Sequence, residues 1–278
     1  MARLFGLIGN RADLAGRVLL SERDVLRVRV KPGSQIGWGI GFHQGGEVLM
    51  RKRPIDERED IDLGQFASDI KGDVVIGHVR TATVGALRTD NTHPFRYRQW
   101  IFAQTGTISR FDVARDRLLE SVPQFLRAGI RGETDSEIIF HIFLSFLHDD
   151  GLLNEAQVPD VAVGKALRGT LALVDSLSAE IGSEPMRTNI LVTGGRSLVA
   201  AHRGEKMAYR LFAGRNDGEA LVADDFKLKL KTPELGSIRF GLLASDFDAV
   251  LSSRWKPCPD NSILILDGLS EPIIESLG

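Results

Sequence analysis

Short runs of apolar and β-branched residues, bounded by glycine or polar residues, recur at both ends of the chain and predict β-strands. In the first part of the chain they cover residues 4–8, 38–42, 47–51, 73–79 and 99–103. Beyond residue 189 they cover residues 190–193, 198–202, 208–212, 220–223, 240–244 and 263–266. The pairs Gly45-Gly46 and Gly194-Gly195 each separate two neighbouring runs, which favours tight hairpin turns.

The middle of the chain has the periodicity of helices. Residues 134–148 carry isoleucine, phenylalanine and leucine at helical spacing, which gives one wide apolar face. Thr134 and Glu137 form a predicted capping box, in which each side chain bonds a backbone N–H of the other residue. Two further helices are predicted over residues 111–119 and 161–181.

This order of elements predicts the architecture. Strands, then helices, then strands favour two sheets with helices outside them. The chain has 278 residues and shows neither a low-complexity linker nor an internal repeat. We therefore expect one large layered domain over residues 1–278.

Composition narrows the class of function. The formal net charge of −2 leaves no basic footprint, which argues against nucleic acid as a partner. The chain lacks an apolar run of the roughly 18 to 20 residues that span a bilayer, and its start lacks the layout of a signal peptide, so we expect a cytoplasmic protein without membrane contact. The single cysteine, Cys258, excludes an intramolecular disulfide and any multi-cysteine metal site.

Four polar motifs follow one another along the chain, each at or near the edge of a predicted element. They are Gly37-Trp38-Gly39-Ile40, Gly77-His78-Val79-Arg80, Asn91-Thr92-His93-Pro94-Phe95 and Gly132-Glu133-Thr134-Asp135-Ser136-Glu137. In this order and spacing the set resembles the class II glutamine amidotransferases, and later segments from residue 189 to residue 257 extend the resemblance to nearly the whole chain. The resemblance implies an α+β fold, the four-layer α/β/β/α sandwich of the N-terminal-nucleophile type, with glutamine as ligand and neither cofactor nor metal.

The resemblance also assigns roles to three residues. Arg80 ends an apolar strand, where a guanidinium can grip a carboxylate through two parallel hydrogen bonds, and the family position holds the α-carboxylate of glutamine. Asp135 lies in the first turn of the strongest helix, where the helix dipole stabilises a carboxylate whatever its function, and the family position binds the α-amino group. His93 is expected to shape the loop beside the pocket rather than to bind a metal.

Three departures from the family pattern fall at its chemical centre. Ala2 stands where the family has the nucleophilic cysteine, whose own amine serves as the base after Met1 is removed. Gln104-Thr105-Gly106 stands where the family has His-Asn-Gly, so the oxyanion hole keeps the N–H of Gly106 and exchanges an amide for the shorter hydroxyl of Thr105. Ile36 replaces an aspartate that precedes the Gly-Trp-Gly segment.

Two hypotheses follow. The first is a pseudoenzyme that binds glutamine or a related amino acid, or serves as a scaffold for a partner protein supplied as a separate chain. The second is an active glutamine amidohydrolase or amidotransferase in which alanine was engineered in place of a natural cysteine at position 2. Motifs of rival chemistries, such as Gly-x-Ser-x-Gly, the P-loop and His-Glu-x-x-His, do not occur in the sequence.

Overall fold

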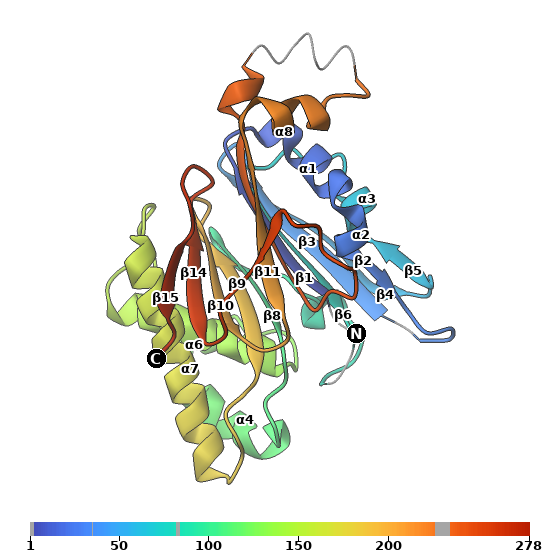
Figure 1. Cartoon of the computed structure of the whole chain (residues 1–278). Coiled ribbons are helices and arrows are strands. Elements are labelled where there is room, and N and C mark those ends of the chain that lie inside the picture. The colour runs from blue at the N-terminus through green and yellow to red at the C-terminus, as the bar shows by residue number, and fades with distance from the viewer. Residues whose placement is uncertain (1–2, 35, 82–83, 226–233) are drawn as a thin grey trace.

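The computed structural model of the chain describes residues 3–34, 36–81, 84–225 and 234–278 (Figure 1). Its strands are β1 (Arg3–Gly9), β2 (Arg27–Arg29), β3 (Ile36–Gln44), β4 (Glu47–Asp56), β5 (Asp60–Asp62), β6 (Val74–Arg80), β7 (Phe95–Tyr97), β8 (Trp100–Thr105), β9 (Thr188–Thr193), β10 (Leu198–Arg203), β11 (Met207–Ala213), β12 (Arg239–Ser245), β13 (Trp255–Pro257), β14 (Ser262–Leu266) and β15 (Ile273–Ser276). Its helices are α1 (Ala15–Ser21), α2 (Arg23–Leu26), α3 (Leu63–Phe66), α4 (Phe111–Glu120), α5 (Gln124–Arg127), α6 (Asp135–Asp149), α7 (Asp160–Glu180) and α8 (Gly214–Leu221). Ala2 lies outside the described residues.

Two antiparallel sheets form the centre of the molecule. The described residues build a seven-stranded sheet in the order β13-β11-β12-β1-β6-β3-β4 and a six-stranded sheet in the order β15-β14-β10-β9-β8-β7. The sheets face each other, with α4, α6 and α7 outside the smaller sheet and α1 to α3 outside the larger one (Figure 1). This arrangement confirms the predicted four-layer α/β/β/α sandwich.

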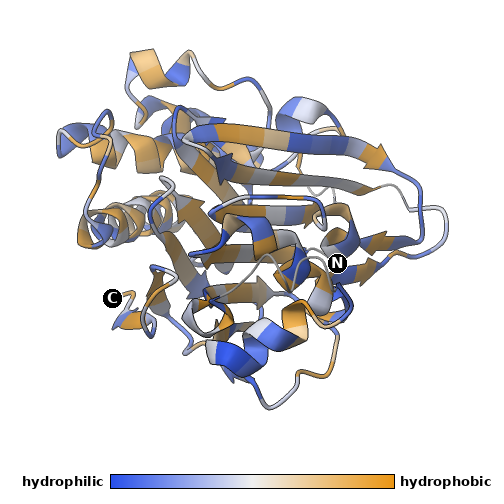
Figure 2. Ribbon diagram, turned by 90° about the horizontal axis from the view of Figure 1, so that it is seen from above, coloured by the Kyte–Doolittle hydropathy of each residue, from blue (hydrophilic) through white to orange (hydrophobic). Residues whose placement is uncertain are grey.

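Each layer boundary is an apolar core. The inner core lies between the sheets and includes Leu4, Ile76 and Leu191, while separate clusters fill the space between each sheet and its helices. Figure 2 shows the same distribution, because hydrophobic colouring is concentrated on the strands and the helices, whereas the connecting loops are more hydrophilic. The two sheets approach closely at Gly6, where a Cβ atom would lie 2.5 Å from the side chain of Leu198.

The side chains of β1 alternate between two cores. Leu4 and Ile8 belong to the core between the sheets, whereas Phe5 and Leu7 belong to the core under α1 to α3. This is the period of two expected of a strand that is buried on both faces. Arg3 has the same parity as Phe5, so its side chain lies on the helix-covered face of the larger sheet.

Packing of α6 on the smaller sheet fixes the start of that helix. The ring of Phe140 stacks on Phe102 with centroids 5.1 Å apart, and Phe143 meets Trp100 edge-on at 5.5 Å. Burial of each such side chain contributes roughly 1.5–3 kcal/mol. This packing fixes α6 against β8, so that the first turn of α6 lies near Thr105, where β8 ends.

Most predicted elements are confirmed within one or two residues, including the helices α4, α6 and α7. Both glycine-pair hairpins form, but β4 continues to Asp56, well beyond the predicted end at residue 51. The strand predicted over residues 220–223 is wrong, because residues 214–221 form α8, whose buried side packs against Leu235 and Ile238. The capping box is half correct. Thr134 accepts from the N–H of Glu137 at 3.3 Å, but the Glu137 carboxylate accepts from Arg131 and Gly132 instead of the cap residue.

Candidate functional site

A cavity of ≈ 250 Å³ lies where β6, β8 and α6 converge at one end of the sandwich. Arg80 ends β6, Thr105 ends β8, and Asp135 begins α6. The described residues that line the cavity are His78, Arg80, Thr81, Val84, His93, Gln104, Thr105, Gly106, Thr107, Thr134, Asp135 and Ser136. The fold therefore brings together Arg80, His93, Thr105, Gly106 and Asp135, which the sequence had placed in four separate segments.

Asp135 is buried at the N-terminus of α6, where its carboxylate is held by backbone donors. Its Oδ2 accepts from the N–H of Ile108 at 2.8 Å, and its Oδ1 accepts from the N–H of Ser136 at 2.8 Å. Burial raises the pKa of Asp135, and these hydrogen bonds oppose that rise. The Ser136 hydroxyl also lies 3.3 Å from Oδ1, so Oδ2 is the oxygen with a lone pair left to accept from an ammonium group in the cavity.

Arg80 is buried and already has backbone partners. Its Nη1 donates to the carbonyl of Ala86 at 3.0 Å, and its Nη2 donates to the carbonyls of Val84 and Gly85 at 2.5 and 2.9 Å. Burial lowers the pKa of Arg80, and the nearby Asp135 opposes that change. A guanidinium has five N–H donors, so Arg80 both secures the 84–86 loop and retains donors for a carboxylate.

The side chain at the exchanged oxyanion position, Thr105, and that of its neighbour Gln104 both bond to other protein groups. Thr105 donates its hydroxyl to Oδ2 of Asp246 at 3.2 Å. The Gln104 amide nitrogen donates to the carbonyls of Thr105 and Gly106 and to the Thr188 hydroxyl, while its oxygen accepts from Ser136. In this arrangement both side chains use their donors on protein acceptors.

Gly106 occupies a position that only glycine fits. Its φ is +111°, and a Cβ atom there would lie 2.2 Å from the carbonyl oxygen of Arg187. The backbone at the end of β8 is therefore held against the segment that leads into β9. Gly106 itself lies in the wall of the cavity.

Asp246 is a site residue to which sequence reasoning assigned no role. It follows the last residue of β12 with φ +58°, a left-handed conformation that turns its carboxylate toward Thr105 on the facing sheet. Ser245 donates a second hydroxyl to the same oxygen, Oδ2, at 2.5 Å. Burial raises the pKa of Asp246. The available signal was a polar pair at the end of an apolar strand.

Two buried imidazoles form another wall of the cavity. The rings of His78 and His93 lie 4.3 Å apart, and His93 also contacts Phe95 edge-on at 4.6 Å. Burial lowers the pKa of His78 to about 3 and that of His93 well below its ordinary value, so both rings are neutral. The backbone of His93 passes close to β3, since a Cβ on Gly39 would lie 2.2 Å from the His93 carbonyl oxygen. The segment thus shapes one wall of the cavity.

Ile36 does not line the cavity. It is 2% exposed at the start of β3 and packs with Phe5 and Phe42 in the core beneath α1 to α3. Isoleucine in place of aspartate at position 36 therefore adds an apolar side chain to the core under α1 to α3, away from the ligand cavity.

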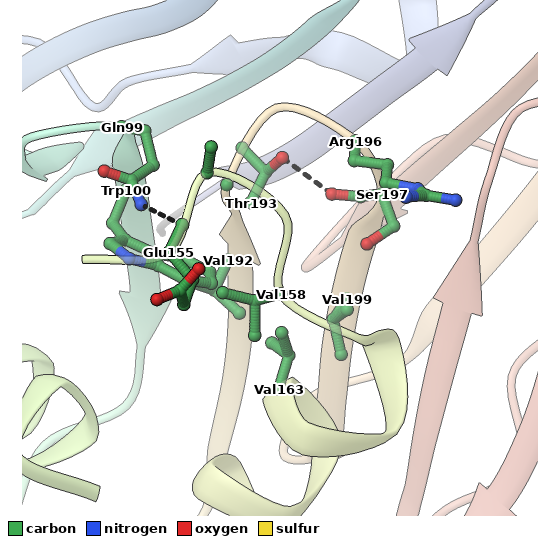
Figure 3. A pocket seen from close by; sticks show the side chains of 12 residues that line it. Gln99, Trp100, Glu155, Val158, Val163, Val192, Thr193, Arg196, Ser197 and Val199 are labelled. Carbon is green, nitrogen blue, oxygen red and sulfur yellow. Dashed lines mark hydrogen bonds between the residues drawn. The ribbon is translucent and has the colours of Figure 1, made fainter. Parts of the chain in front are cut away.

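A separate cavity lies between the β9–β10 hairpin and the loop after α6, with Val158, Val163 and Val192 among its walls (Figure 3). Its volume of ≈ 20 Å³ is close to that of one water molecule, so it does not suit an amino acid. Among residues that the structure describes, no group of three or more His, Cys, Asp and Glu side chains could hold a metal ion. The described helices also include none with the length and apolar character needed to cross a membrane.

Relatives with related sequences and folds are known. The probable glutamine amidotransferase DUG3 of Saccharomyces cerevisiae is 28% identical over 273 residues, which cover 89% of this chain and 74% of the yeast protein. A glutamine aminotransferase class-II domain protein from Silicibacter pomeroyi superposes with a TM-score of 0.61 at 16% identity, over 99% of this chain and 98% of that one. The glutamine phosphoribosylpyrophosphate amidotransferase of B. subtilis superposes with a TM-score of 0.57 at 16% identity, over 99% of this chain and 49% of that one.

At these identities the two superpositions establish a shared fold. The sequence adds the family, since residues 7–266 match the class-II glutamine amidotransferases. The chain belongs to the class II glutamine amidotransferase family.

Proposed function

We propose that this chain is a non-catalytic class II glutamine amidotransferase that binds glutamine or a related amino acid in the cavity between Arg80 and Asp135. The observation that carries the proposal is the hydrogen bond from Thr105 to Asp246, together with the bonds of the Gln104 amide to the Thr105 carbonyl and the Thr188 hydroxyl. These contacts occupy the side-chain donors of Thr105, at the oxyanion position, and of its neighbour Gln104, while the two charged groups suited to an amino acid still line the cavity.

The chemistry of the cavity supports an amino acid as ligand. Asp135 would accept from the α-ammonium group, whose positive charge would stabilise this buried carboxylate. Arg80 would donate its remaining N–H groups to the α-carboxylate. The volume of ≈ 250 Å³ is just below the range of about 300–1,000 Å³ typical of drug-sized ligands, which fits a small metabolite.

The loss of catalysis follows from what an acyl transfer needs. Without a thiol at position 2 there is no sulfur to attack the amide carbon, and loss of a nucleophile that acts within a catalytic unit costs on the order of 10⁶ in turnover. Loss of one oxyanion donor costs about 2.7–4 kcal/mol more. The cavity would then act in ligand binding, or the fold would act as a scaffold for a partner protein.

Calorimetric titration with glutamine tests the ligand. We expect Arg80→Gln to weaken binding by about 10- to 100-fold, the effect of losing a charge-assisted pair. Arg131→Gln, at an exposed arginine in the loop before α6, is the matched control and is expected to bind as the wild type does. Glutaminamide, which lacks the α-carboxylate, separates the two roles of Arg80, because its binding is expected to be insensitive to Arg80→Gln unless the loop itself is disturbed.

Ammonia release from glutamine tests the chemistry. We expect no turnover from the wild type or from Ala2→Cys, and a gain only when Ala2→Cys is combined with Thr105→Asn. Robust turnover by Ala2→Cys alone would instead support an active amidohydrolase whose natural cysteine was replaced. Absence of glutamine binding by the wild type would remove the ligand and leave the scaffold role.

A further inference from the structure

A second cavity, of ≈ 310 Å³, lies on the helix-covered side of the larger sheet, where β1 begins. Its described walls come from β1, α2, β2 and the segment after β12, and they consist of Arg3, Asp24, Arg27, Arg29, Asp248 and Ala249. Five of these six residues carry charge, and three are arginines. We call this space the Arg3 cavity. It shares no lining residue with the cavity between Arg80 and Asp135.

Arg3 is a buried cation whose ion pair among the described residues is long. Its side chain is 1% exposed, and its Nη2 donates to the carbonyl of Arg27 at 3.1 Å. The nearest carboxylate oxygen with which it pairs belongs to Asp248 and lies 3.6 Å away, on a side chain that is 66% exposed. The Nε and Nη1 atoms are buried and have no hydrogen-bond partner among the residues that the structure describes. A fully buried arginine is rare unless it is paired, because burial removes its hydration.

The other two arginines differ in how their charge is balanced. Arg27 is paired with Asp60 and Asp62, each at 3.3 Å. Arg29 is exposed, and within the described part of the chain no carboxylate oxygen lies within ion-pair distance of it. Arg3 and Arg29 are therefore the two guanidinium groups at this cavity whose charge lacks a close partner.

The acidic residues of the cavity do not cancel this charge. Asp24 and Asp248 are both exposed, so water screens them strongly. Asp246 attracts Arg3 only at longer range, and its carboxylate is turned toward Thr105 on the facing sheet. Burial has the largest effect on the pKa of Arg3 and lowers it, because it disfavours the charged form.

We propose that the Arg3 cavity is a binding site for a small oxyanion, a carboxylate or phosphate group, held by Arg3 and Arg29. Such a group would supply a closer counter-charge to Arg3 than Asp248 does, and guanidinium groups match the planar or tetrahedral oxygens of both anions through paired N–H donors. Asp248 is exposed and its contact with Arg3 is long, so it is the group that an incoming anion would displace.

Thermal unfolding of the full chain at constant ionic strength tests the site. Inorganic phosphate and malonate are the probes, and sodium chloride replaces them in the reference samples. A saturable rise in Tm is expected, about 5 °C at a hundredfold excess over Kd. A rise with phosphate alone assigns the site to phosphate groups, a rise with malonate alone assigns it to carboxylates, and either result supports the proposal.

Variants identify the arginines. Arg29→Gln is expected to leave the Tm in chloride unchanged and to weaken anion binding by about tenfold or more. Arg3→Met is expected to unfold at the wild-type temperature or above it in chloride, because a buried charge with only one long ion pair is removed, and to lose the anion response. Arg196→Gln, at an exposed arginine of the β9–β10 hairpin whose partner is the neutral Gln157, is the matched control and should respond as the wild type does.

The proposal is overturned if neither anion produces a saturable rise in the wild type, or if Arg29→Gln responds as strongly as Arg196→Gln. If Arg3→Met does not fold, Arg29→Gln decides the question by itself. Glutamine titration of the same variants is expected to be unchanged, so failure of the Arg3 cavity and failure of the amino-acid cavity would be seen in different measurements.

Discussion

The contact between Thr105 and Asp246 leads to a prediction that can be worked through from the structure. Thr105→Val keeps the shape of the side chain and removes its hydroxyl. In the wild type this hydroxyl donates to Asp246 at 3.2 Å, from the end of β8 on one sheet to the end of β12 on the other. The substitution therefore removes a polar bridge between the two sheets at the rim of the cavity.

The magnitude follows from geometry and burial. A hydrogen bond to a charged acceptor contributes about 1.5–3 kcal/mol, and a length of 3.2 Å is beyond the usual range for a hydroxyl donor. Asp246 also keeps the bond from Ser245, so its carboxylate is not left without a donor. We therefore expect Thr105→Val to lower the free energy of unfolding by about 1–1.5 kcal/mol, which corresponds to roughly 2–5 °C in Tm for a chain of this size.

Urea unfolding at neutral pH measures this change, and a double-mutant cycle assigns it. Thr105→Val, Asp246→Asn and the double variant are compared, and the coupling energy is expected to be about 1 kcal/mol. The control cycle pairs Thr105→Val with Ser68→Ala. The Ser68 hydroxyl, just after α3, donates to the carbonyl of Gln65 and shares no partner with Thr105, so this coupling should be small.

The reasoning is refuted if Thr105→Val and Asp246→Asn are additive within the error of the measurement. In that case the Thr105 hydroxyl is not committed to Asp246, and it would be free to serve as an oxyanion donor. The proposal of a non-catalytic protein would then lose the observation that carries it.

Three further predictions concern the frame of the site. Gly106→Ala is expected to lower the free energy of unfolding by about 2–4 kcal/mol, because it adds a Cβ 2.2 Å from a carbonyl oxygen at φ +111°. The control Gly45→Ala, at φ +59° with open space around it, should lower it by only about 1 kcal/mol. Equal losses in urea unfolding would refute the overlap argument. Thr134→Ala removes the cap that accepts from Glu137, and we expect a loss of about 0.5–2 kcal/mol that Thr134→Ser restores; a stable Thr134→Ala protein would show that the cap is dispensable. Burial raises the pKa of Asp135 above its ordinary 3.8, so the folded state binds this proton more tightly than the unfolded chain, and the stability associated with it falls as the pH rises from 3.8 through the folded pKa. Asp135→Asn is expected to flatten that part of the stability curve between acid and neutral pH, and an unchanged slope would contradict this assignment.

Local signals predicted much of the fold. The hairpin between β3 and β4 follows from Gly45-Gly46, whose φ angles of +59° and +84° are those that a tight hairpin turn requires. Helix α6 follows from its cap and its apolar periodicity, and it begins one residue after Thr134. Signals of this kind depend on residues close together in the chain, so they can be read without knowledge of the fold.

Predictions failed where distant residues compete for a short segment. Residues 220–223 have the apolar character of a strand, but the preceding turn is helical because its buried side packs under Leu235 and Ile238. A run of four residues is too short for periodicity to separate the two structures. Glu137 similarly has the spacing of a capping partner, and its carboxylate accepts instead from Arg131 and Gly132, because the loop before α6 folds back over it.

The sequence by itself predicted the family, the order of the layers and five of the residues that line the cavity, because the order and spacing of the motifs follow the chain. Only the tertiary structure decided what those residues do there. The Thr105 hydroxyl could donate a hydrogen bond to an oxyanion, but it donates instead to the carboxylate of Asp246, 141 residues away. In the sequence Arg3 is an ordinary charged residue near the start of the chain. In the structure it is buried beside an arginine-lined cavity, where its charge is poorly compensated. The choice of a hydrogen-bond partner and the loss of water around a charge depend on which distant segments are packed together, and that information is absent from any local stretch of sequence.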